Sequence, residues 1–316
     1  MLTLVRRAAS LALIGAVAPL TLETAAAPAQ APAAPALLVS PQQLAPELKD
    51  PGLVLLHVGP REDYDAGHIE GARFVQLMDV AASRQENPLS LELPDEDALR
   101  ARLQRYGIGD DSRVVVTFGQ DWHSPATRVI WTLQIAGLGA QTRLLDGGTR
   151  EWSRAGLPLT KAAPPAAQPG RLTRPLDRSV LADHAWVQAR LRAPDVTVID
   201  ARAPVFYEGP GMDNHRAGHL PGAVNLPFNS LADDAVRMLP LDALRERFRA
   251  AGVQAGDTVV AYCHVGQQAT VVVLAARLLG HPVKLYDGSM DDWERRGLPL
   301  ENAKAPKPRQ GTRAAR

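Results

Sequence analysis

Cys263 is the only cysteine among the 316 residues, and its surroundings are suited to presenting a nucleophile. A short β-branched run, residues 257–262, precedes it, and an apolar run typical of a helix begins at Ala269. A thiol between a strand and a helix faces the unpaired N–H groups and the positive dipole end of that helix, which favour an anionic sulfur. The loop of residues 263–268 therefore predicts a reactive thiolate.

Two other interpretations of this cysteine stay open. A buried cysteine is commonly an inert small hydrophobe, although a position where a loop enters a helix argues against that role. A redox-sensing thiol is the second alternative, but the chain has no other cysteine to resolve a sulfenic acid. One cysteine and eight histidines without ligand spacing indicate no zinc site, and no cofactor is expected.

Three motifs occur twice in the same order, which indicates a tandem duplication. Chance is a poor explanation for three ordered matches. The copies are residues 67–72 and 218–223 (Gly-His, then Gly-Ala), residues 146–152 and 287–293 (Asp-Gly, then an acidic residue and Trp), and residues 156–159 and 297–300 (Gly-Leu-Pro-Leu).

Composition divides the chain into segments. Residues 1–31 combine Arg6 and Arg7 with an apolar run and small residues suited to cleavage, so they are expected to form a signal peptide. The other expected segments are an Ala/Pro-rich linker to about residue 36, a domain at 37–160, a second linker at 161–169, a domain at 170–301 and a disordered tail at 302–316.

The signal peptide predicts a periplasmic or otherwise exported protein, with no stable membrane insertion after cleavage. A net charge of +1 gives no electrostatic basis for binding nucleic acid. Hydrophobic residues make up 46% of the chain, which is sufficient for a buried core in each of two domains.

Strand and helix patterns alternate in both halves, which predicts α/β domains with a parallel sheet covered by helices on both faces. In such sheets the functional site lies at the carboxyl ends of the strands, where Cys263 falls. The expected strands are 53–58, 114–118 and 142–145, then 195–200, 258–262 and 283–286; the expected helices are 95–106 and 126–136, then 241–251, 269–279 and 291–296.

Taken together, these motifs resemble the rhodanese family of sulfurtransferases. The matching residues stand in the family's order: Asp200–Arg202, residues 218–223, the loop 263–268, and Asp287–Ser289 with Trp293. The resemblance covers nearly everything between the signal and the tail. It implies two tandem rhodanese-like domains, of which only the second, 170–301, is catalytic; the corresponding loop of the first half, 119–125, has no cysteine.

The chemistry that this resemblance implies is a two-step transfer without a cofactor. Cys263 takes the outer sulfur of thiosulfate or 3-mercaptopyruvate as a persulfide, and then passes it to cyanide, a thiol or a protein acceptor. The backbone N–H groups of the loop, opened by Gly266, would hold the negative charge. Val265 is a departure, since many thiosulfate-specific relatives carry basic residues in this loop. Thiosulfate nevertheless fits an exported protein better than 3-mercaptopyruvate does.

For the side chains around the loop, the sequence leaves more than one role open. Arg202 either orients the donor or pairs with Asp200, and the sequence favours neither. His264 either binds an anion or faces solvent. Beside Cys263, the complete set of expected substrate-binding residues is Arg202, His264, Val265, Gly266, Gln267 and Gln268.

Histidines outside the loop are expected to be structural. His68 and His219 occupy the same place in the two halves, although only one half has a nucleophile. Trp122 and His123 are expected to be ordinary loop residues, with lining of a cleft as the alternative. Arg216, in an insertion of the second half, is a further cation that could assist donor binding.

Three other functions could also use a reactive cysteine in such a loop. A cysteine phosphatase has a similar loop, but its phosphate-binding arginine stands six positions after the nucleophile, where this chain has Ala269. A cysteine hydrolase requires a general base that the sequence does not place. The main alternative is a persulfide carrier or oxyanion-binding module that acts with a protein partner and does not turn over small acceptors.

Overall fold

The computed structural model describes residues 37–120, 123–209 and 218–301. The expected signal peptide with its linker, the expected tail, Trp122 and Arg216 lie outside the described residues. Within these ranges no helix is both long and apolar enough to cross a membrane.

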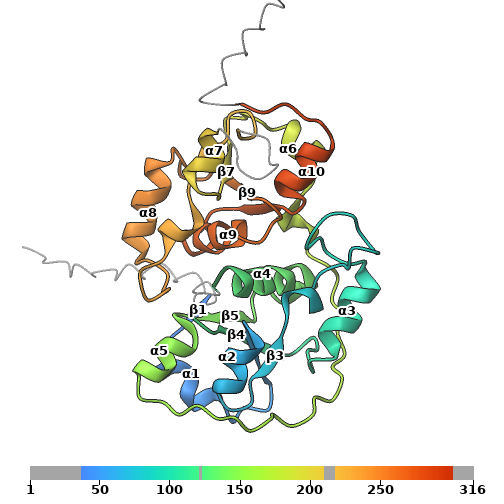
Figure 1. The fold of residues 1–316 in the computed structure, drawn as a ribbon, viewed down its shortest axis with the longest axis vertical. Helices are drawn as coiled ribbons and strands as arrows, with labels where there is room; N and C mark the ends of the chain where they lie inside the picture. Colours follow the sequence, from blue (N-terminus) through green and yellow to red (C-terminus); the bar gives the residue numbers. More distant parts are fainter. Residues whose placement is uncertain (1–36, 121–122, 210–217, 302–316) are drawn as a thin grey trace, which may run out of the picture. The chain divides into compact units, whose positions relative to one another are not determined.

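Each half contains a five-stranded sheet in which every paired strand is parallel to its neighbours (Figure 1). The strand orders are β1-β5-β4-β2-β3 and β6-β10-β9-β7-β8, which are the same topology repeated. The strands are β1 (Leu38–Val39), β2 (Leu53–Val58), β3 (Arg73–Val75), β4 (Arg113–Phe118), β5 (Thr142–Leu145), β6 (Leu181–Ala182), β7 (Val196–Asp200), β8 (Val224–Asn225), β9 (Thr258–Tyr262) and β10 (Val283–Tyr286).

Helices connect the strands, and several begin at side chains that satisfy the first free N–H groups. Asp95 accepts from the N–H of Ala98, and Asp183 accepts from the N–H of Trp186. The helices are α1 (Pro41–Leu44), α2 (Arg61–Ala66), α3 (Glu96–Gln104), α4 (His123–Leu133), α5 (Gly148–Arg154), α6 (His184–Gln188), α7 (Pro204–Glu208), α8 (Leu241–Ala250), α9 (Ala269–Leu278) and α10 (Ser289–Arg295).

The expected fold, two tandem α/β domains with parallel sheets, is confirmed. All six predicted strands are present within one residue of their expected bounds. The helix expected at 126–136 differs most: α4 begins three residues earlier, and a π-helical segment, Gln134–Leu138, follows it. Pro125 is compatible with the earlier start because the first turn of a helix needs no N–H from it.

β9 divides its side chains between two cores, and this division places the cysteine. Val259, Ala261 and Cys263 belong to a large core that contains residues of both halves. Val260 and Tyr262 belong to a smaller core on the other face of the second sheet. The alternation of a strand therefore directs Cys263 to the face that is shared with the first half.

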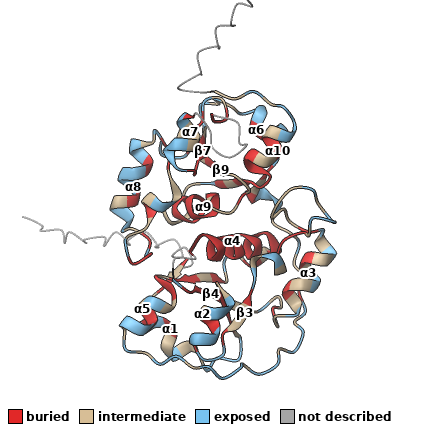
Figure 2. Ribbon diagram, viewed as in Figure 1, coloured by how far each residue is buried: buried red, intermediate tan, exposed pale blue. Residues whose placement is uncertain are grey.

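α4 and α9 form the middle of that shared core. They pack against each other between the two sheets, as their neighbouring positions in Figure 1 indicate. All 11 residues of α4 are buried, and α9 is buried from Ala269 to Ala276 (Figure 2). Because a helix covered on all sides needs apolar residues all round, the weak amphipathicity of the α9 sequence follows from its position.

The connection between the halves packs on the first half before the second sheet begins. The N–H of Gly170 donates to the carbonyl of Gln104 at 2.9 Å, and the N–H of Asp110 donates to the carbonyl of Arg171 at 3.0 Å. A Cβ on Gly170 would lie 2.1 Å from the carbonyl oxygen of Ile108, so this position requires glycine. The second sheet starts only at β6.

Candidate active site

Cys263 follows β9 directly, and it is buried with 1% of its surface exposed. Its N–H donates to Oγ of Ser289 at 3.2 Å, and its carbonyl accepts from the N–H of Met290 at 3.1 Å. The carbonyl of His264 accepts from the N–H of Asp291 at 3.1 Å. The start of the loop is therefore fixed to the first turn of α10.

The rest of the loop turns tightly into α9. Gly266 has φ +75°, in the left-handed region that favours glycine, and a Cβ there would lie 2.5 Å from the carbonyl oxygen of Asp287. The ring of His264 meets the ring of Phe206 edge-on, with 4.7 Å between centroids. The side chain of Gln267 donates to Oγ of Ser124, in the first half, at 3.1 Å. His264 thus contacts Phe206 and Gln267 contacts the first half, and the substrate-binding role of the loop side chains stays a prediction.

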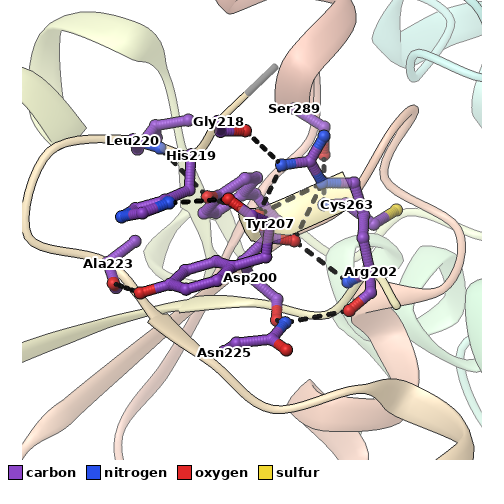
Figure 3. Close-up of polar contacts among 11 residues, drawn as sticks. Asp200, Arg202, Tyr207, Gly218, His219, Leu220, Ala223, Asn225, Cys263 and Ser289 are labelled. Carbon is purple, nitrogen blue, oxygen red and sulfur yellow. Dashed lines mark hydrogen bonds and ion pairs between the residues drawn. The ribbon is translucent and has the colours of Figure 1, made fainter. Parts of the chain in front are cut away.

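Arg202 is buried and bound to Asp200, which is one of the two roles left open by the sequence (Figure 3). Its Nε and Nη2 donate to the two carboxylate oxygens at 2.9 and 2.6 Å, and Nη2 also donates to the carbonyl of Gly218 at 2.8 Å. Burial lowers the pKa of Arg202, but the hydrogen bonds and charge of Asp200 outweigh this and leave it raised. The hydroxyl of Tyr262 donates to the same carboxylate at 2.8 Å.

His68 and His219 have matching packing roles in the two halves. His68 stacks on Tyr64 with 3.8 Å between ring centroids, and its Nδ1 lies 2.8 Å from the carbonyl oxygen of Tyr64. His219 stacks on Tyr207 at the same centroid distance, with Nδ1 2.9 Å from that residue's carbonyl oxygen. Both rings thus pack against a tyrosine of their own half, in agreement with the structural role expected for them.

The first half repeats the strand arrangement of the site but has other side chains at the positions of Asp200 and Cys263. In the parallel sheet of the first half, His57 is in register with Thr117, and in the second sheet Asp200 is in register with Tyr262. Thr117 and Tyr262 therefore occupy equivalent positions. The residue that follows each of them is Phe118 in the first half and Cys263 in the second. Burial, and then the charge of His68, lowers the pKa of His57 to about 4. A buried neutral imidazole and a phenyl ring thus replace the carboxylate and the thiol.

His123, expected to be a loop residue, is buried at the start of α4. Its ring stacks on Phe228 of the second half, with 5.7 Å between centroids. It therefore packs between the halves and is not part of an open loop.

Sequence reasoning missed the residues that the first half contributes to the loop. Arg128 donates to the carbonyl of Gly266 at 3.1 Å and forms an ion pair with Asp287. Glu92 lies beside the same aspartate; burial, and then the charge of Asp287, raises its pKa to about 8. No local sequence signal marks these two residues, because their partners in the second half are more than 130 positions away in the chain.

A pocket of about 590 Å³ lies at the edge of the loop. The first half supplies nearly all of its lining, including Arg61, Phe74, Met78 and Ser124, and the loop supplies Gln267. The space therefore adjoins the loop of the second half but is shaped mainly by the first half.

Comparison with known proteins gives one consistent result. The sequence pattern of the Rhodanese-like domain matches residues 40–155 and 183–296. A probable 3-mercaptopyruvate sulfurtransferase from Pseudomonas aeruginosa is 35% identical over 272 residues, covering 82% of this chain and 95% of that protein. Thiosulfate sulfurtransferase from Rattus norvegicus is 32% identical over 246 residues, covering 76% and 81%.

Among solved structures, SseA from Escherichia coli, described as a 3-mercaptopyruvate sulfotransferase, superposes with a TM-score of 0.71 and 26% identity. The match covers 80% of this chain and 98% of SseA. EanB in complex with ergothioneine shares the fold, with a TM-score of 0.75, 21% identity, and coverage of 86% and 71%.

Proposed function

Because this chain belongs to the rhodanese-like family and is a sulfurtransferase, we propose that it transfers sulfane sulfur through a persulfide on Cys263. The observation that supports this proposal is the position of Cys263 at the end of β9, inside a loop that leads into the N-terminus of α9. The equivalent position of the first half is Phe118, so that half has no thiol to carry sulfur.

The first step forms one S–S bond and breaks another. The Cys263 thiolate attacks the outer sulfur of thiosulfate, and sulfite leaves with the electron pair of the broken bond. The second step reverses the direction of attack, as cyanide or a thiolate takes the outer sulfur and the Cys263 thiolate is released. Each step conserves charge and needs no oxidant or cofactor. Negative charge stays at the sulfur throughout, so N–H groups of the loop and the N-terminus of α9 stabilise it.

Thiosulfate is proposed as the donor to test first, with 3-mercaptopyruvate as the second. Relatives named for each of these donors are about equally similar to this chain. The loop carries His264 as its only ionisable side chain besides Cys263, and Arg202 is occupied by Asp200. The acceptor is proposed to be a small thiophile, namely cyanide or a thiol.

We also propose that the mature protein acts outside the cytoplasm. Arg6, Arg7 and the apolar run that follows support export. Cell fractionation with mass determination of the mature N-terminus tests this proposal, and a full-length chain found only in the cytoplasm would contradict it.

The test of function measures thiocyanate formation from thiosulfate and cyanide, together with the intact mass after treatment with thiosulfate alone. Wild-type protein should turn over and gain the mass of one sulfur atom, and Cys263→Ser should do neither. If thiosulfate fails, the same pair of measurements with 3-mercaptopyruvate decides the donor. A protein that gains sulfur from either donor but does not release it to cyanide or thiols would instead be a persulfide carrier.

A further inference from the structure

Arg128 reaches from α4 of the first half into the catalytic loop of the second half. Its side chain is buried, with 1% of its surface exposed. Nη1 donates to the carbonyl of Gly266 at 3.1 Å and to Oδ1 of Asp287, and Nη2 donates to the carbonyl of Leu91. The guanidinium carbon lies 4.6 Å from the ring centroid of Trp131, which holds the group from one face. One side chain thus joins three backbone segments.

Both partners of Arg128 in the second half belong to segments that contact or contain Cys263. Gly266 is in the loop that encloses Cys263. Asp287 begins the turn that leads to Ser289, whose hydroxyl accepts from the N–H of Cys263. A guanidinium that fixes both segments therefore fixes two sides of the sulfur site.

The Gly266 contact also sets the direction of an N–H group. In a trans peptide the carbonyl and the following N–H point to opposite sides. The carbonyl of Gly266 accepts from Arg128, so the N–H of Gln267 points away from that guanidinium. Gly266 already has φ +75°, and a Cβ on it would lie 2.9 Å from Nη1 of Arg128. The loop has little freedom to adopt another shape while this contact exists.

We propose that Arg128 is a positioning residue for sulfur transfer: from the cysteine-free half it holds the loop in the shape that directs N–H groups at the Cys263 sulfur. This inference rests on the persulfide mechanism proposed above. It assigns the first half an indirect, positioning part in sulfur transfer, since a rigid loop is needed where charge on sulfur must be stabilised without reorganisation. Arg128 does not touch the reacting atoms in this assignment and acts through Gly266 and Asp287.

The test compares Arg128→Met and Arg128→Lys with a matched control in the full chain. The control is Arg277→Met, because Arg277 also donates from one half to a backbone carbonyl of the other, Gly139 at 3.3 Å, but from the last turn of α9. Single-turnover loading of sulfur from saturating thiosulfate is followed by intact mass, and the unfolding midpoint of each variant is measured in parallel.

Arg128→Met should load sulfur more slowly by on the order of tenfold or more, since small misplacements of a reacting group cost this much. Arg128→Lys should recover part of the loading rate, because its ammonium group keeps the ion pair with Asp287. It lacks the planar guanidinium that donates to three oxygen atoms at once. Arg277→Met should lose stability but load at the wild-type rate.

Three results would overturn the inference: loading at the wild-type rate in Arg128→Met, full recovery in Arg128→Lys, or equal slowing in Arg277→Met. If Arg128→Met does not fold, Arg128→Lys carries the test, and a wild-type loading rate in that variant rejects the role. Absence of loading in the wild-type protein contradicts the proposed function itself, so the two failures are distinguishable.

Discussion

The N–H of Cys263 donates to the hydroxyl of Ser289 at 3.2 Å, and that hydroxyl donates in turn to the carbonyl of Tyr286 at 2.8 Å. Cys263 is therefore anchored by a side chain from a turn 26 residues further along the chain. Ser289 has φ +52°, so the turn itself is held in the left-handed region. The Asp-Gly-Ser motif of the sequence thus fixes the start of the loop of residues 263–268.

Ser289→Ala should lower the free energy of unfolding by about 1–3 kcal/mol, because the buried N–H of Cys263 loses its acceptor. Sulfur transfer should fall as well, since the base of the loop is released. Urea unfolding and thiocyanate formation measure the two effects. Ser230→Ala, which removes a hydroxyl that bonds locally to Pro227, should change neither by as much. Equal effects in the two variants would argue against the anchor.

Gly266→Ala should abolish most of the activity, because the new Cβ would lie 2.5 Å from the carbonyl oxygen of Asp287 and 2.9 Å from Nη1 of Arg128. Gly280→Ala is the matched control: Gly280 has φ +85°, but nothing lies within 4 Å of its Cβ position. The control should cost only the conformational strain, about 1 kcal/mol, and keep its activity. Activity assays and urea unfolding of both variants check this, and an active Gly266→Ala would contradict it.

Glu92 should make the protein less stable in alkali. Its folded pKa of about 8 exceeds its ordinary value of 4.5, chiefly through burial. The folded state therefore retains the proton longer than the unfolded state, so the stabilisation is complete below the unfolded pKa and is lost as the pH rises through the folded one. Glu92→Gln stays neutral, so it should show a smaller loss of unfolding free energy between about pH 5 and about pH 9. Glu62→Gln, at an exposed position, should follow the wild type.

His57 should act in the opposite direction, in acid. Its folded pKa of about 4 lies below its ordinary value of 6.5, so the unfolded state takes up the proton first and stability falls as the pH falls from 6.5 toward 4. The full effect is about 3 kcal/mol. Neither ring nitrogen has a hydrogen-bond partner among the described residues, so His57→Leu loses no such bond. In this variant the free energy of unfolding should fall less as the pH is lowered from 6.5 toward 4. Urea unfolding of both proteins across this pH range measures the difference. An equal fall of the unfolding free energy in the variant and the wild type would show that His57 does not cause the acid dependence.

Asp200→Asn should destabilise the protein by about 3–5 kcal/mol, because Arg202 would remain buried without its counter-charge. Tyr262→Phe removes one hydrogen bond to the same carboxylate and leaves the buried N–H of Leu220 without its acceptor, so it should cost about 1–3 kcal/mol. Thermal or urea unfolding of the two variants separates these values. A mild Asp200→Asn phenotype with a large loss of donor binding would favour the other role of Arg202, orientation of the donor.

Local patterns carried the prediction of the catalytic half. β9, the loop and α9 are adjacent in sequence, and each has a pattern of its own, so Cys263 could be placed at the mouth of a strand-loop-helix unit. Short edge strands such as β6 and β8 were not predicted, since two residues show no periodicity. Their pairing depends on neighbouring strands that only the folded chain brings alongside.

The contacts that tie the loop to the first half could not be predicted for the same reason. In the sequence, Arg128 is one of several polar residues in a helix of mixed composition, and Glu92 is one acidic residue in a loop. Their significance comes from the packing of α4 on α9, which joins positions far apart in the sequence. The choice for Arg202 between Asp200 and a donor was likewise open until its burial was known.

Phe118 in the position of Cys263 also limits how a thiol site could be built into the first half. Phe118→Cys would supply a thiol, but Gly59 stands where Arg202 stands in the second half and Gly148 stands where Ser289 does. A Cβ on Gly148 would lie 2.4 Å from the carbonyl oxygen of Phe118, so a serine anchor cannot simply be added. A second sulfur-transfer site of this design in the first half would thus require changes at Phe118, Gly59 and Gly148 together, and the backbone around Gly148 would have to shift to admit one of them.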